Sequence, residues 1–136
     1  MARARVYELM AIKQSIELNA YRREAARLHE EIERLDKRRE QIVDLDQGYR
    51  AQLAVPGLTP NEYRDITQII SRLHERTAVD LARREILETE RERVSRILAE
   101  KKRKIERLEE EAKSIKVKER QAIEERNLML MPERRK

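Results

Sequence analysis

The chain has 136 residues, of which 43% are charged and 3% aromatic, and it contains no Cys, Trp or Phe. Ala, Glu, Lys, Leu and Arg together make up about 60% of it, which is typical of long helices and coiled coils. The β-branched and aromatic residues and frequent turns of a sheet protein are scarce. The composition therefore predicts an all-α chain, without disulfides, thiol catalysis or Cys-ligated zinc.

The start of the chain does not resemble a signal peptide, because Arg3, Arg5, Glu8 and Lys13 interrupt its apolar residues. No stretch approaches the ~20 consecutive apolar residues of a membrane span. We therefore expect a cytoplasmic protein without stable membrane insertion.

The first predicted helix covers residues 4–54. Its apolar residues recur at helical spacing. They are Val6, Leu9, Ile12, Ile16, Leu18, Tyr21, Ala25, Leu28, Ile32, Leu35, Ile42, Tyr49 and Leu53. The seven-residue register slips between Ile16 and Tyr21 and is polar from Lys37 to Glu40, which predicts local changes of supercoil within one helix.

A turn is predicted at residues 55–59, where Pro56 precedes Gly57. Thr59 has the position of an N-cap, with Pro60 at the first helical position and Glu62 completing a capping box. The second helix is therefore predicted to begin at residue 60, and it covers residues 60–131.

The second helix carries a seven-residue repeat that starts at Ile66. Its members are Ile66, Leu73, Asp80, Leu87, Val94, Lys101, Leu108, Ile115, Ala122 and Met129. The positions four residues later are Ile70, Thr77, Arg84, Arg91, Leu98, Ile105 and Ala112. This pattern predicts a coiled-coil seam that becomes polar between Thr77 and Arg91.

A short turn between two long helices predicts an antiparallel coiled-coil hairpin with a longer C-terminal helix, as a single unit over residues 1–136. The alternative is one very long helix that dimerises in parallel. If the bend is at Gly57, residues beyond Glu111 extend past the first helix and still carry many apolar side chains. The excess positive charge lies at the same end, with balances of +2 in residues 1–13 and +4 in residues 113–136. We interpret this basic, apolar end as a partner-binding surface; a frayed end is the alternative.

No catalytic or metal-binding pattern is present in the sequence. His29 and His74 are isolated, and no HExxH, phosphate-binding loop or GxSxG motif occurs. We therefore expect no enzyme activity, no cofactor and no metal.

Three segments near the predicted turn resemble the FliJ/YscO family of type III secretion proteins: residues 45–53, residues 57–63 and residues 66–73, followed by the Lys101-Lys102 pair. The Tyr49-Arg50 pair and the Gly-Leu-Thr-x-Asn-x-Tyr element at residues 57–63 favour the flagellar branch. The resemblance implies an antiparallel hairpin similar to the stalk subunit of rotary ATPases.

The resemblance also implies partners. Members of this family insert the end that bears both termini into the hexameric type III export ATPase and promote its assembly. They also bind the cytosolic domain of the export gate and export chaperones, at the periphery of the inner membrane. Carried onto this chain, the ATPase-binding end comprises Arg3, Arg5, Leu9, Lys13, Ile115, Lys116, Lys118, Ile123 and Leu128.

The export-gate patch implied by the resemblance comprises Ile42, Leu45, Tyr49, Ile69 and Leu73. The chain departs from the family at Arg38, Arg76 and Asp80, where uncharged or differently polar residues are expected. Apart from Leu45 and Ile69, which lie off the seam positions, the patch residues also fit a simple role in helix packing.

Two other classes of function stay open at this stage. One is a structural, homodimeric coiled-coil scaffold. The other is a coiled coil associated with nucleic acid, which the few aromatic residues and the lack of a continuous basic block disfavour. We therefore expect no nucleic-acid partner.

Overall fold

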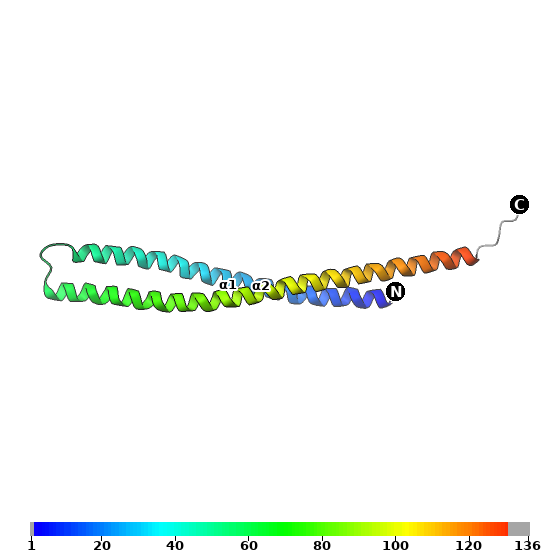
Figure 1. Ribbon diagram of the computed structural model, residues 1–136, viewed down its shortest axis with the longest axis horizontal. Helices are drawn as coiled ribbons and strands as arrows, with labels where there is room; N and C mark the ends of the chain where they lie inside the picture. Colours follow the sequence, from blue (N-terminus) through cyan, green and yellow to red (C-terminus); the bar gives the residue numbers. More distant parts are fainter. Residues whose placement is uncertain (1, 131–136) are drawn as a thin grey trace. The chain divides into compact units, whose positions relative to one another are not determined.

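The protein is built from two long helices that pack together (Figure 1). The computed structural model describes residues 2–130. Helix α1 covers Ala2–Leu53 and helix α2 covers Pro60–Leu130, and the described residues contain no strand. The expectation of an all-α chain is confirmed. The sequence predicted helices at 4–54 and 60–131, and residue 131 lies outside the described part of the chain.

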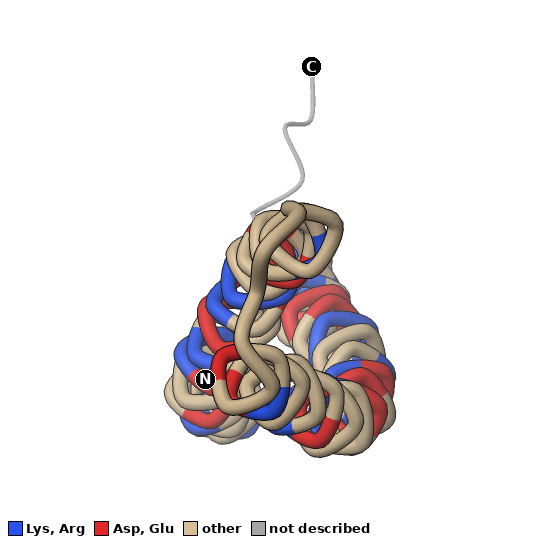
Figure 2. The backbone as a smooth tube through the Cα atoms, turned by 90° about the vertical axis from the view of Figure 1, so that its left-hand side faces the viewer, with Lys and Arg blue, Asp and Glu red and all other residues tan. Residues whose placement is uncertain are grey.

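The turn between the helices is defined by interactions and backbone angles of its own residues. The amide of Glu62 donates a hydrogen bond of 3.2 Å to the Thr59 hydroxyl, so Thr59 caps α2 as its sequence position predicts. Gly57 has a φ of 88°, a conformation that side-chain-bearing residues rarely adopt. Figure 2 shows this uncharged turn in front of helices on which acidic and basic residues are interspersed.

The helices form two compact units. Residues 24–95 make one unit, and residues 2–23 together with residues 96–130 make the other.

In residues 24–95, aliphatic side chains from both helices form a narrow core. Leu28 and Val94 are its most deeply buried members, at 1% and 0% exposure. The other buried aliphatic residues are Ile32, Leu35, Ile42, Ile66 and Leu87. Along the polar contacts that join the helices, residue numbers rise in α1 and fall overall in α2. These contacts are Glu31–Arg83, Asp36–Arg84, Arg38–Asp80 and the 3.4 Å approach of His74 Nε2 to Asp46 Oδ1.

In residues 2–23 and 96–130, the core is lined by smaller side chains. Ala4, Ala11 and Leu18 of α1 are buried at seven-residue spacing, and Ala112 and Ile115 of α2 are also buried. This arrangement corrects the predicted seam of the first helix, whose members Val6, Leu9, Ile12 and Ile16 are all exposed. At ~100° per residue, Leu9 lies about 180° around the helix from Leu18. A seven-residue repeat through Ala4, Ala11 and Leu18 keeps one face of α1 against α2. The register slip predicted between Ile16 and Tyr21 is therefore not required to explain the packing.

The seam predicted for α2 agrees with its burial. Every predicted seam position from Ile66 to Ile115 is buried or half-buried, including the polar ones, whereas Ala122 and Met129 are exposed. The polar seam residues Asp80, Arg84 and Lys101 must therefore find partners at the helix interface.

Candidate interaction surfaces

Asp80 and Arg38 form the centre of a polar layer in residues 24–95. Asp80 is 6% exposed and accepts two hydrogen bonds from Arg38, of 2.8 Å from Nε and 3.0 Å from Nη2. Arg76 Nε lies 3.4 Å from the same carboxylate. Arg38 and Arg76 therefore both contact the Asp80 carboxylate. The polar stretch of α1 at residues 37–40 therefore meets the polar stretch of α2 at this contact.

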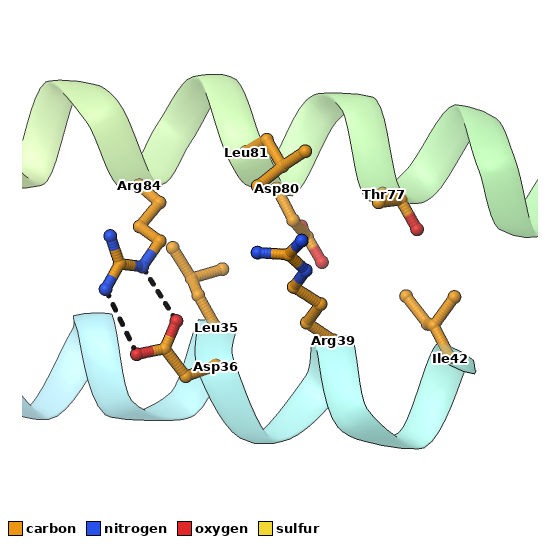
Figure 3. A pocket seen from close by; sticks show the side chains of 8 residues that line it. All are labelled: Leu35, Asp36, Arg39, Ile42, Thr77, Asp80, Leu81 and Arg84. Atoms are coloured by element: carbon orange, nitrogen blue, oxygen red, sulfur yellow. Dashed lines mark hydrogen bonds and ion pairs between the residues drawn. The ribbon is translucent and has the colours of Figure 1, made fainter. Parts of the chain in front are cut away.

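A second interhelical pair lies one turn away. Arg84 donates hydrogen bonds of 2.7 and 3.3 Å to the two carboxylate oxygens of Asp36 (Figure 3). This contact lowers the pKa of Asp36 and raises that of Arg84. A cavity of about 10 Å³ lies beside the pair, with Leu35 and Ile42 in its lining. It has at most the room of one water molecule, so it is no ligand site.

Lys101 fills a seam position in the other unit, where its ammonium is held by α1. Its Nζ donates hydrogen bonds of 2.7 Å to Glu17 and 3.2 Å to Gln14, and it lies 5.6 Å from the centre of the Tyr21 ring. The bond from Lys101 lowers the pKa of Glu17. The stem of Lys101 thus packs like an apolar residue while its charge is compensated.

Glu8 is held between two cations at the start of α1. Lys116 of α2 forms an ion pair with it, and Arg5 Nη1 lies 3.3 Å from its other oxygen. The contact with Lys116 is the largest cause of its lowered pKa. Lys116 therefore joins the two helices although its side chain is 57% exposed.

The residues carried over as the ATPase-binding end fall into two groups. Ile115 is 7% exposed and packs in the helix interface, so its side chain is not presented to a partner. All the others except Lys116 are exposed at the protein surface. They are Arg3, Arg5, Leu9, Lys13, Lys118, Ile123 and Leu128.

The residues carried over as the export-gate patch also differ in exposure. Ile42 is buried in the core of residues 24–95, whereas Leu45 is 50% exposed. Tyr49, Ile69 and Leu73 are half-buried. Leu45 is therefore the patch residue that a partner could contact most directly. Its neighbour Asp46 accepts a hydrogen bond of 2.9 Å from Arg50.

Sequence reasoning missed one surface feature, which we call the aliphatic stripe: Val6, Leu9, Ile12 and Ile16. These residues were predicted to pack against the second helix, although Leu9 was also predicted to contact a partner, and all four face solvent. The signal that could have found them is the repeat of Ala4, Ala11, Leu18 and Ala25, which competes with the larger aliphatic residues for the inner face.

Within residues 2–130, no group of three or more His, Cys, Asp or Glu side chains is arranged to hold a metal ion. No helix among these residues has the length and apolar character needed to cross a membrane. Comparisons of the chain with protein-family models, with curated proteins and with solved structures found no match.

Proposed function

We propose that this chain is a non-enzymatic stalk component of a type III protein export apparatus, and that it forms an antiparallel coiled-coil hairpin. It would insert into the hexameric export ATPase and promote assembly and activity of the ring. The proposal starts from the resemblance of residues 45–73 to the FliJ/YscO family, with the flagellar branch favoured. It places the protein in the cytoplasm, at the periphery of the inner-membrane export apparatus.

The observation that carries the proposal is the exposed apolar and basic end of α2. Ile123 is 44% exposed and Leu128 is 68% exposed, and Lys118 is exposed on the same segment. Residues 113–136 carry a net charge of +4, so the exposed aliphatic side chains of this segment favour a partner that is apolar and acidic. Arg3 and Lys13 of α1 add positive charge in the same unit.

The burial of individual side chains reduces the number of residues that we propose to contact the ATPase. Ile115 and Lys116 hold α2 against α1, so their loss would loosen the hairpin as well as any partner contact. We therefore assign direct contact with the ATPase to Arg3, Lys13, Lys118, Ile123 and Leu128. Leu9 is 50% exposed and stays a candidate for the same contact.

Contact with the export gate and with export chaperones is the second part of the proposal. Leu45 is the best-exposed member of the gate patch, and Ile69 and Leu73 are half-buried beside the helix interface. Since Ile42 is buried, its role in this patch is to support the exposed residues.

The test mixes the purified chain with a flagellar type III export ATPase and measures ATP hydrolysis and hexamer formation. A chain without residues 117–136 keeps Ile115 and Lys116, and we expect it to stay helical and lose the stimulation. The double variant Ile123→Asp with Leu128→Asp should also stay helical and lose the stimulation. The matched control is Val79→Asp with Ile86→Asp, which places the same charges at exposed positions of residues 24–95.

Three results would contradict this proposal. Undiminished stimulation by the truncated chain would remove the contact from this end. A stable homodimer without effect on any of several export ATPases would favour the structural scaffold. Affinity for nucleic acid that falls steeply with salt would favour a nucleic-acid-associated coiled coil.

A further inference from the structure

The aliphatic stripe of α1 lies on the side of the helix that faces away from α2. Val6, Leu9, Ile12 and Ile16 are each at least half exposed, and Ile16 reaches 64%. The opposite side of the same three turns carries the buried Ala4 and Ala11. This segment therefore has apolar side chains on two faces, of which α2 covers one.

The surroundings of the stripe are basic. Residues 2–16 contain Arg3, Arg5 and Lys13, and their one acidic residue is Glu8. Glu8 is already engaged by Arg5 and by Lys116. At ~100° per residue, Arg5 and Lys13 lie among the stripe residues on this face of α1. The charge on this face is therefore positive, so an occupant of complementary charge is anionic.

We propose that this face of α1 lies in the surface of an anionic lipid bilayer, parallel to the membrane plane. Val6, Leu9, Ile12 and Ile16 enter the boundary between headgroups and acyl chains, and Arg5 and Lys13 contact lipid phosphates. Such interfacial helices bury one apolar face about 5–10 Å deep and do not span the bilayer. Basic side chains at the membrane surface strengthen this contact with anionic lipids.

Two features favour lipid over a protein as the occupant. A second copy packed on the stripe about a two-fold axis would bring two basic faces together, and this like-charge contact opposes association. The stripe is also purely aliphatic and convex, whereas the strongest contacts of protein interfaces are enriched in Trp, Tyr and Arg set in pockets. A fluid bilayer requires no matching pocket.

This inference does not rest on the proposed function, although lipid would compete with any partner that binds Leu9 and Lys13. The test is sedimentation of the full chain with vesicles of phosphatidylglycerol and phosphatidylcholine, or of phosphatidylcholine alone. We expect binding to the anionic vesicles only, and weaker binding as salt rises. Lys13→Gln should weaken binding roughly fivefold, since one basic residue near the surface is lost.

Variants separate insertion of the stripe from general adsorption. Ile12→Glu with Ile16→Glu should reduce vesicle binding at least tenfold, because two charges would enter the apolar boundary. Val79→Glu with Ile86→Glu alters similarly exposed residues elsewhere in the chain and should change binding less than twofold. Circular dichroism of both variants checks that each keeps its helices.

The absence of Trp gives a positional readout. Single-tryptophan variants Ile12→Trp and Ile86→Trp report the polarity around each side chain, and we expect a blue shift with anionic vesicles for Ile12→Trp alone. Equal shifts, or none at either position, would overturn the proposal. A homodimer in sedimentation equilibrium that the Ile12→Glu, Ile16→Glu variant abolishes would overturn it in favour of a second copy on the stripe.

Discussion

Arg38 and Asp80 join the two helices through two hydrogen bonds, of 2.8 and 3.0 Å, at a carboxylate that is 6% exposed. Asp80 occupies a seam position at which coiled coils usually have an apolar residue. A shift of register between the helices would leave this carboxylate buried without its partner, which would destabilise the shifted alignment. The pair therefore favours one alignment of α1 against α2.

Removal of the arginine tests this role. Arg38→Ala should lower the free energy of unfolding by about 1–2 kcal/mol, less than for a fully buried pair because the Arg38 side chain is 42% exposed. The matched control is Arg34→Ala, whose ion pair with Glu30 is long, at 4.0 Å, and exposed. It should change stability by less than about 0.5 kcal/mol in urea unfolding. Equal effects of the two variants would contradict a special role for Arg38.

Replacement of both partners should have the opposite effect. Arg38→Leu with Asp80→Leu removes the cost of desolvating the charges and adds apolar contacts at the seam, so stability should stay equal or rise. Thermal unfolding measures this change. A loss larger than that of Arg38→Ala alone would mean that the pair stabilises the fold in its own right.

The aliphatic core of residues 24–95 predicts a clear contrast between two leucines of α1. Leu28 is 1% exposed and Leu45 is 50% exposed. Leu28→Ala should cost about 2–4 kcal/mol, because it leaves a cavity in a packed site. Leu45→Ala should cost less than about 0.5 kcal/mol, as surface substitutions usually do. Similar costs in chemical denaturation would place Leu45 in the core and remove it from the proposed gate patch.

Local chemistry explains which parts of the fold are predictable. Thr59 and Gly57 identify the turn because a cap and a positive φ depend on neighbouring residues only. The seam of α2 follows from large apolar residues at regular spacing. The partner of Asp80 could not be predicted in the same way, because Arg38 lies 42 residues away and its position depends on the alignment of two helices.

The residues on the inner face of α1 were predicted wrongly for a related reason, because local spacing does not determine which face packs against α2. Alanine is compatible with both buried and exposed positions, so Ala4 and Ala11 carry little weight beside Leu9 and Ile12 in a count of apolar residues. Among the candidate site residues, burial separated Ile42 from Leu45, although both are aliphatic and three positions apart. Sequence spacing alone could not show which of these residues pack in the core and which are available to contact a partner.

Substitutions on the two faces of α1 test the corrected register. Ala11→Leu should cost about 1–3 kcal/mol, since a larger side chain overfills a buried position. Ile12→Ala should cost less than about 0.5 kcal/mol, because Ile12 is half exposed and alanine favours helices. Thermal unfolding followed by circular dichroism measures both. A costly Ile12→Ala together with a harmless Ala11→Leu would restore the register predicted from sequence.

The ion pairs between the helices predict how stability depends on pH. The pKa of Glu17, held by Lys101, and that of Asp36, held by Arg84, are both lowered from their ordinary values of 4.5 and 3.8. A carboxyl group with a lowered pKa in the folded state stabilises the fold above its unfolded pKa. This contribution decreases as pH falls below about 4.5 and is lost once pH passes through the folded pKa. The melting temperature should therefore fall between pH 5 and pH 3.

Variants of Glu17 and Lys101 identify the source of this acid sensitivity. Glu17→Gln should flatten the decrease in melting temperature between pH 5 and pH 3, because glutamine does not titrate. Lys101→Met should flatten it as well, since the cation that lowers the pKa of Glu17 is gone. The double variant should resemble either single variant, because both remove the same interaction. An unchanged acid slope in all three would show that Glu17 and Lys101 are not coupled in the folded protein.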